Sequence, residues 1–136
     1  MNRPLLLVED DLDDHEMMVH ALGELGVSNP IKHFKDAEAA LAYLRVSPES
    51  PFLIVSDVNM PKMSGLDFKG HIESCVDLKK RNIPFVFLST TATDHYVNEA
   101  FTLNAQGYFV KGCSFDDLKS TLKAILGYWT KTKRPN

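Results

Sequence analysis

The sequence has no long hydrophobic run and little that suggests export from the cytoplasm. No apolar stretch approaches the roughly 18 residues that a membrane-spanning helix requires. The first residues, Met1-Asn2-Arg3-Pro4, pass directly into a short apolar run followed by acidic residues, unlike a cleavable signal sequence. We therefore expect a cytoplasmic protein without membrane contact.

Cysteine is also scarce, with two residues in a chain of 136. Cys75 and Cys113 lie far apart, and neither belongs to a CxxC or histidine-rich motif. This pattern predicts buried or partly buried free thiols rather than a disulfide or a metal site. A redox role for Cys113 is a minor alternative.

The chain has no excess of positive charge, because 15 Lys and Arg residues face 18 Asp and Glu residues. Acidic residues cluster near the N-terminus, while residues 131–136 form a short basic tail that we interpret as a solvated end. No DNA-binding module is recognisable, so we do not expect nucleic acid as a partner.

What the sequence does contain is a regular alternation of short apolar runs and helical periodicity. Four almost wholly apolar runs are typical of parallel strands covered on both faces, and an alternating run at 31–34 suits an edge strand. The four runs are 5–8, 52–55, 85–88 and 108–110. Helical spacing covers 12–25, 37–44, 66–78, 97–101 and 115–129, the last preceded by Ser114 as an N-cap.

Five such alternations predict one α/β domain over residues 1–136, with a core of about 4–129. Right-handed crossovers then give a five-stranded parallel sheet of order 2-1-3-4-5 between helices, a three-layer (βα)5 sandwich. In such a sheet the ligand site lies beyond the carboxyl ends of the strands, between the first and third.

Polar side chains follow four of the predicted strands at this rim. In chain order they are Glu9, Asp10, Asp11, Ser56, Asp57, Ser89, Thr90 and Lys111. A single acid after a strand is most simply a loop residue or an N-cap. The joint pattern on one rim predicts a functional site instead.

Glu9, Asp10 and Asp57 would bring three carboxylates together. Two like charges about 4 Å apart repel by roughly 4 kcal/mol at an effective dielectric of about 20, so the cluster requires a cation. Oxygen ligands without His or Cys favour a hard ion, and so few carboxylates favour Mg²⁺ over a caged Ca²⁺.

An EF-hand interpretation of the acidic segment fails. Glu16 stands where that loop requires glycine, and Leu22 stands where it requires the closing glutamate. Asp13 and Asp14 are therefore better interpreted as acidic residues in the first turn of a helix.

Lys111 and Ser89 complete the rim chemistry. The Lys111 ammonium can pair with Asp57 or with a phosphoryl oxygen, although taken alone it is equally well a surface lysine. Ser89 supplies a hydroxyl donor. Carboxylate nucleophile, divalent ion, cation and hydroxyl together predict a phosphoryl-transfer site.

The motifs around these residues resemble the receiver domain of two-component response regulators, from about Pro4 to Trp129. Leu-Leu-Val-Glu-Asp-Asp at 6–11 resembles the family's acidic pair after the first strand. Ser-Asp-Val-Asn-Met-Pro-Lys-Met-Ser-Gly at 56–65 resembles its phosphoacceptor loop, and Gly-Tyr-Phe-Val-Lys at 107–111 resembles its last strand. The resemblance implies a flavodoxin-like fold.

The resemblance also implies site roles. Asp57 would accept the phosphoryl group, and Lys111 and Ser89 would contact the phosphoryl oxygens. Tyr108, otherwise a core aromatic, would be a switch that turns into space vacated by Ser89. The implied Mg²⁺ ligands are Asp10, Asp57, the backbone carbonyl of Asn59 and, directly or through water, Glu9.

The partners implied by the resemblance are a sensor histidine kinase or a phosphotransfer protein as donor and a downstream protein as target. The chain would catalyse only its own phosphorylation and dephosphorylation. Asn59 and Thr91 occupy positions that vary with dephosphorylation rate in the family. Thr90 stands where a smaller residue is common, which should narrow access to Asp57.

One departure concerns the loop after the last strand. Gly112 stands where the family usually has a proline after a cis peptide bond, and a cis bond before glycine would cost about 2.5 to 4 kcal/mol. Within the family, the loop at 111–114 and the pair Tyr128-Trp129 look most like stand-alone, phytochrome-associated regulators. The aromatic pair suggests a homodimer contact, while the alternative, a core cap, leaves a monomer equally open.

Three other functions fit less well. An aspartate-nucleophile phosphohydrolase needs a second aspartate where Asn59 stands. A flavin-binding protein needs a phosphate-cradling loop where Glu9-Asp10-Asp11 stands. A pseudo-receiver, a binding module that does not use phosphate, is disfavoured by the complete set of acids, hydroxyl and lysine.

Overall fold

Five short strands form a parallel sheet in the predicted order β2-β1-β3-β4-β5. The computed structural model describes residues 3–133. In the predicted positions, to within a residue at either end, lie β1 (Leu5–Val8), β2 (Ile31–Phe34), β3 (Leu53–Ser56), β4 (Phe85–Ser89) and β5 (Gly107–Val110). The three central strands are buried throughout, whereas the edge strands β2 and β5 are partly exposed.

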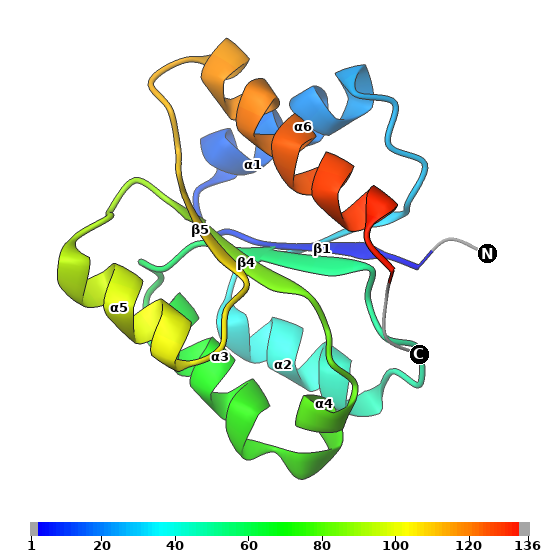
Figure 1. Cartoon of the computed structure of the whole chain (residues 1–136), viewed down its shortest axis with the longest axis vertical. Helices are drawn as coiled ribbons and strands as arrows, with labels where there is room; N and C mark the ends of the chain where they lie inside the picture. The colour runs from blue at the N-terminus through cyan, green and yellow to red at the C-terminus, as the bar shows by residue number, and fades with distance from the viewer. Residues whose placement is uncertain (1–2, 134–136) are drawn as a thin grey trace.

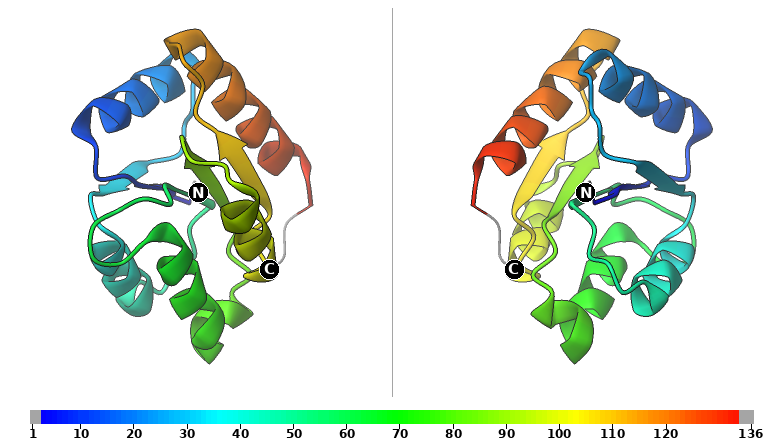
Figure 2. Two further views of the ribbon diagram at one scale, coloured as in Figure 1. Left: turned by 90° about the vertical axis from the view of Figure 1, so that its left-hand side faces the viewer. Right: turned by 90° about the vertical axis from the view of Figure 1, so that its right-hand side faces the viewer.

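Helices cover both faces of the sheet, which confirms the three-layer prediction (Figure 1, Figure 2). One face carries α1 (Leu12–Glu24) and α6 (Phe115–Lys131), which pack against each other. The other face carries α2 (Ala37–Val46), α3 (Gly65–Ser74), α4 (Val76–Lys80) and α5 (Asp94–Thr102). Ser114 caps α6 as predicted, because its side chain accepts a hydrogen bond from the Asp117 N–H.

Strand side chains alternate between the two layers, so each layer has its own apolar cluster. The cluster under α1 and α6 includes Leu5, Leu7, Met18, Leu22, Leu118 and Leu122. The cluster under the other helices includes Leu6, Val8, Ile54, Phe68, Phe85 and Phe87. This burial holds the sheet rigid, and its carboxyl edge can then position side chains accurately.

The predicted helix over 66–78 is wrong in one respect, because it is two helices. Cys75 has an extended backbone (φ −93°, ψ 112°) and separates α3 from α4. In a continuous helix Leu78 would lie about 120° around the axis from Ile72. The break at Cys75 instead lets both leucine and isoleucine enter the same buried cluster.

The chain ends and cysteines differ partly from expectation. Both thiols are free, but only Cys75 is partly buried, whereas Cys113 is exposed in the loop before α6. The expectation of burial is therefore wrong for Cys113, because the rim loop carries it away from the sheet. Residues 1–2 and 134–136, which include the end of the expected basic tail, lie outside the described residues.

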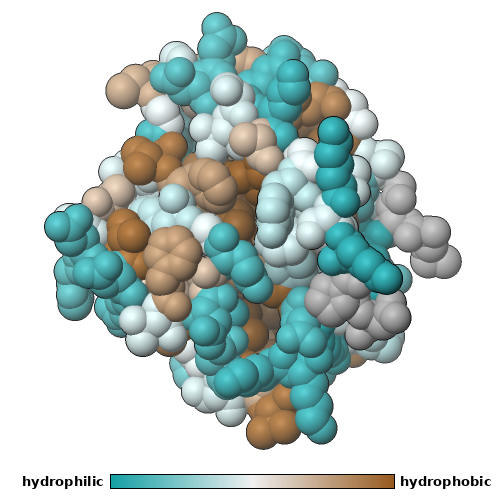
Figure 3. Space-filling model, viewed as in Figure 1, coloured by the Kyte–Doolittle hydropathy of each residue, from teal (hydrophilic) through white to brown (hydrophobic). Residues whose placement is uncertain are grey.

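The two aromatic residues near the end of α6 have different environments. Trp129 packs against the cluster under α1 and α6, while Tyr128 is 62% exposed and meets the Trp129 ring edge-on at 4.9 Å. Trp129 therefore caps the core. A dimer contact through Tyr128 stays a prediction. The face of the molecule in Figure 3 shows hydrophobic side chains in separate patches among hydrophilic ones.

Within residues 3–133, none of the helices has the length and apolar character needed to cross a lipid bilayer.

Candidate functional site

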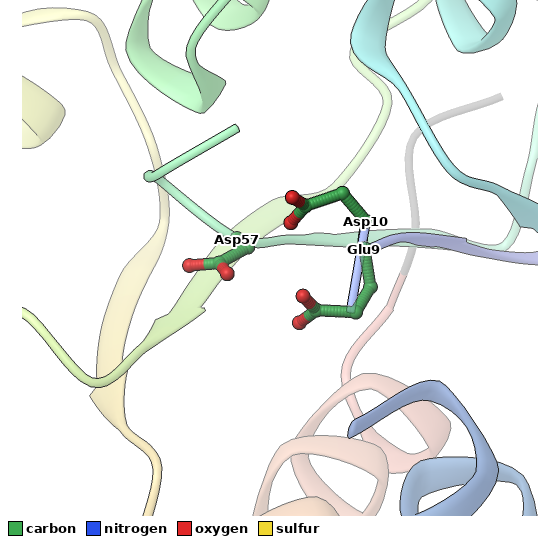
Figure 4. A group of neighbouring side chains, drawn as sticks. All are labelled: Glu9, Asp10 and Asp57. Carbon is green, nitrogen blue, oxygen red and sulfur yellow. The ribbon is translucent and has the colours of Figure 1, made fainter. Parts of the chain in front are cut away.

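The carboxyl ends of β1 and β3 bring the predicted acidic residues together. Val8 pairs with Ser56 in the parallel register, so the residues that follow them leave the sheet side by side. Carboxylate oxygens of Glu9, Asp10 and Asp57 all lie within 4.8 Å of one another. Figure 4 shows the Glu9 and Asp10 carboxylates extending toward Asp57 from the end of β1.

Glu9 is held more firmly than the sequence suggested. Its side chain is buried, its N–H donates to the Phe34 carbonyl at 3.0 Å, and its own carbonyl accepts from His33 Nε2 at 2.8 Å. The carboxylate accepts from the Asp11 N–H at 3.2 Å and from Lys111 Nζ at 2.5 Å. Both ends of this residue are therefore fixed by hydrogen bonds.

Two histidines absent from the sequence prediction support this arrangement. A carbonyl oxygen can only accept, so His33 carries a proton on the Nε2 that bonds to Glu9. The ring of His15, from α1, stacks on His33 with 3.5 Å between centroids and 14° between planes. Burial, followed by the neighbouring His33, lowers the pKa of His15. The alternation of β2 can orient His33, but nothing in the sequence places His15 against it.

Lys111 is surrounded by three carboxylates. Its Nζ lies 2.5 Å from Glu9 Oε1, 2.9 Å from Asp14 Oδ2 and 3.3 Å from Asp57 Oδ2. Burial alone would lower the pKa of Lys111, but hydrogen bonds with Glu9 and Asp14 raise it above its usual value. The ammonium is therefore charged, and Asp14 is a contact that the sequence prediction missed.

The acidic cluster retains electrostatic repulsion despite this lysine. Burial raises the pKa of Glu9 to about 7, and the charge of Asp57 adds to the effect against the opposing influence of Lys111. Most of this rise is a desolvation effect, and the contribution from Asp57 is the part that a bound cation would relieve. The donor set of Glu9, Asp10 and Asp57 consists of oxygen atoms alone, which fits a hard divalent cation such as Mg²⁺.

The loop that carries Asp57 depends on a close backbone approach. Asp57 Oδ1 accepts from the Val58 N–H at 2.7 Å, and the Val58 carbonyl accepts from the Gly65 N–H at 2.8 Å. A Cβ atom on Gly65 would lie 2.0 Å from the Asp57 carbonyl oxygen. Glycine is therefore required at this close approach of two backbone segments.

Thr91 links the predicted switch residues to the predicted rate-tuning residues. Its N–H donates to the buried Ser89 Oγ at 3.2 Å, and its Oγ1 accepts from Asn59 Nδ2 at 2.7 Å. The Tyr108 hydroxyl donates to the Thr91 carbonyl. Burial raises the pKa of Tyr108, which keeps this donor protonated. The side chains of Ser89, Asn59 and Tyr108 thus converge on one residue of the β4–α5 loop.

The loop after β5 lacks the cis peptide bond that is usual in the family. All peptide bonds between described residues are trans, including the one before Gly112. A Cβ atom on Gly112 would lie 2.2 Å from Asp117 Cβ, so the first turn of α6 excludes a larger residue. Thr90 is exposed nearby and, with Lys111 among others, lines a cavity of about 60 Å³.

Comparisons with known proteins match this arrangement. Residues 5–123 match the response regulator receiver domain. The probable methanogenesis regulatory protein FilR2 of Methanothrix harundinacea (strain 6Ac) is 33% identical over 129 residues, covering 92% of this chain and 82% of FilR2. Response regulator Rcp1 of Synechocystis sp. is 29% identical over 133 residues, covering 94% of this chain and 89% of Rcp1.

Solved structures agree. The phosphorylated cyanobacterial phytochrome response regulator RcpA has a TM-score of 0.88 at 29% identity, covering 98% of both chains. The Mn²⁺-bound form of Rcp1 has a TM-score of 0.85 at 27% identity, covering 98% of this chain and 99% of that one. These neighbours confirm the flavodoxin-like fold and the likeness to phytochrome-associated regulators. Since the match also spans every strand end that carries the clustered side chains, the chain belongs to the response regulator receiver domain family.

Proposed function

We propose that this chain is a two-component response regulator that accepts a phosphoryl group on Asp57 in a Mg²⁺-dependent reaction. The observation that carries the proposal is the position of the Asp57 carboxylate, between two other acids and Lys111 at the carboxyl edge of the sheet. With 11% of its side chain exposed, Asp57 is partly desolvated and still open to a donor. A change at this edge would then alter a surface that a downstream protein contacts.

The reaction begins at a phosphohistidine of a sensor kinase or phosphotransfer protein. A carboxylate oxygen of Asp57 attacks the phosphorus, and a P–O bond forms as the P–N bond breaks. The electron pair of the broken P–N bond stays on the imidazole nitrogen of the donor histidine, and this nitrogen then takes up a proton. Lys111 and Ser89 contact the phosphoryl oxygens, where positioned charge and hydrogen bonds stabilise the transition state.

Asp10, Asp57, the Asn59 backbone carbonyl and Glu9 would hold the divalent cation. When bound, Mg²⁺ neutralises charge on the acids and on the transferred group. The raised pKa of Glu9 and the oxygen-only donor set support this assignment. A Mn²⁺-bound form of the relative Rcp1 adds support from outside the chain.

The response to phosphorylation would start at Ser89. A phosphoryl group brings about −1.5 to −2 charges and new acceptor oxygens in place of one carboxylate charge. A shift of Ser89 toward these oxygens breaks its bond with the Thr91 N–H, and Thr91 also holds Asn59 and Tyr108. The β4–α5 loop and Tyr108 are thus the segment whose conformation responds.

Intact-mass spectrometry tests the proposal. Incubation with Mg²⁺ and a phosphorylated histidine kinase should add one base-labile phosphoryl group, which Asp57→Asn and EDTA abolish and Asp13→Asn leaves unchanged. Access past Thr90 should make acetyl phosphate a slower donor for the wild type than for Thr90→Ala. An unmodified wild type, with a donor that labels a control receiver, would instead indicate a binding module that does not use phosphate.

A further inference from the structure

Asp14 contacts the phosphoryl-binding lysine although it lies outside the proposed metal ligands. It belongs to the first turn of α1, and its Oδ2 lies 2.9 Å from Lys111 Nζ. That distance is shorter than the 3.3 Å between the same nitrogen and Asp57 Oδ2. The Asp14 N–H donates to the Asp11 cap at 3.1 Å, so the backbone of Asp14 is fixed where its side chain reaches Lys111.

The hydrogen-bonding capacity of Lys111 is already filled. An ammonium group has three protons, and Glu9, Asp14 and Asp57 accept one hydrogen bond each from Nζ. The Lys111 side chain is 8% exposed, so water does not provide a substitute at low cost. Phosphorylation of Asp57 converts the acceptor of the longest of these bonds, at 3.3 Å, and any further bond from Lys111 to a phosphoryl oxygen requires Glu9 or Asp14 to be displaced.

Asp14 is the carboxylate that can leave most easily. Glu9 is 1% exposed and fixed by hydrogen bonds at both ends, whereas 35% of the Asp14 side chain is exposed. Water can solvate an exposed carboxylate after it turns away, so losing its ion pair costs little. Displacing the buried Glu9 would leave its carboxyl group without a partner inside the protein, which is more costly.

We propose that Asp14 is a positioning residue, a counter-ion of the unphosphorylated state that competes with the phosphoryl group for Lys111. The inference rests on the proposed function of Asp57. Phosphorylation exchanges the Asp14–Lys111 bond for a phosphoryl–Lys111 bond, and it thereby breaks an ion pair that joins α1 to the end of β5. Asp14 sets the phosphoryl affinity of the site without contacting the phosphoryl group.

Beryllofluoride, an analogue of the phosphoryl group, provides the test. It is titrated in saturating Mg²⁺ into the wild type and into Asp14→Asn, with calorimetry as the readout. Asp13→Asn is the matched control, because Asp13 shares the Asp11 cap and its charge but is exposed and has no described bond to Lys111. Asp14→Asn should bind beryllofluoride about two- to fivefold more tightly than Asp13→Asn, as expected for the loss of a partly exposed ion pair.

Two further variants separate competition from a structural effect. Asp14→Ala should show the same gain as Asp14→Asn, and Asp14→Glu, which keeps a carboxylate, should bind like the wild type. Equal affinities for Asp14→Asn and Asp13→Asn, or weaker binding by Asp14→Asn, would overturn the inference alone. A wild type that binds no beryllofluoride and accepts no phosphoryl group would overturn the proposed function and the inference with it.

Discussion

Replacing Lys111 with methionine tests how strongly the acidic cluster depends on its buried cation. Methionine keeps most of the apolar stem and removes the charge. The ammonium lies within 2.5 to 3.3 Å of three carboxylates and is 8% exposed, so its loss leaves these charges uncompensated. Removing one partner of a buried ion pair costs about 3 to 5 kcal/mol. Because Asp14 can turn toward water, we expect about 3 kcal/mol, the lower end of this range.

Mg²⁺ should restore more stability to the Lys111→Met variant than it adds to the wild type. Charges at the outer limit of the 4.8 Å spacing repel by about 3.5 kcal/mol at an effective dielectric of 20, and the cation relieves this repulsion. If the variant binds Mg²⁺ tenfold more tightly, the same saturating concentration adds about 1.4 kcal/mol beyond the gain of the wild type.

Urea unfolding followed by circular dichroism, in EDTA and in Mg²⁺, measures both effects. Lys119→Met is the control, because Lys119 pairs with Glu24 at 2.9 Å on the surface and should lose less than about 1 kcal/mol. A Lys111→Met variant as stable as the wild type in EDTA would refute the role of Lys111 in neutralising the cluster. An equal gain from Mg²⁺ in both proteins would refute the repulsion argument.

Two further predictions concern the surroundings of the site, and a third concerns an ion pair near the end of α3. Gly65→Ala places a Cβ 2.0 Å from the Asp57 carbonyl oxygen, so we expect a loss of at least about 3 kcal/mol in urea unfolding and no phosphoryl gain in intact-mass spectra. His33→Phe keeps a ring for stacking but removes the donor to Glu9; calorimetry should show about three- to tenfold weaker Mg²⁺ binding, with His33→Gln near the wild type. Burial opposes the charged form of Glu73, but hydrogen bonds from Asn104 and Lys69 outweigh it, so the pKa of Glu73 is lowered in the folded state. Its contribution to stability is therefore complete above pH 4.5 and is lost as the pH falls through the folded-state pKa. Lys69→Met should flatten this acid limb in unfolding measured between pH 7 and pH 3, and an unchanged slope would contradict the assignment.

The sheet and its functional edge were accessible from the sequence because both follow from local patterns. Four apolar runs and one alternating run indicate burial directly, and the order of parallel strands then follows from right-handed crossovers. Parallel strands end on one edge, so Asp57 and Lys111 could be placed together although 54 residues separate them. These steps need only strand position and direction.

The errors arose where tertiary packing decides local structure. Helical periodicity continues from Leu66 to Leu78, yet the chain breaks at Cys75 so that Leu78 can join the buried cluster. Periodicity shows which residues are apolar. It cannot show that the helix must break at Cys75 to bring Leu78 to the buried side. The exposure of Cys113 has the same cause, because the path of its loop is set by the close approach of Gly112 to α6.

The Lys111–Asp57 ion pair was predicted, but the pairs of Lys111 with Glu9 and Asp14 were beyond sequence reasoning for a different reason. Asp14 already had a complete local explanation as an acid in the first turn of a helix, and this role is correct. Its second role, as a hydrogen-bond acceptor for Lys111, depends on where the fold places a lysine that is 97 residues away in the sequence. The sequence motif suggests that the Lys111 ammonium is free to bind a phosphoryl group. In the folded chain, however, Lys111 donates its hydrogen bonds to three acids. Under the proposed function, phosphorylation of Asp57 would exchange one ion pair for another, and the affinity for the phosphoryl group would then depend on the difference between two interactions of Lys111 rather than on either alone.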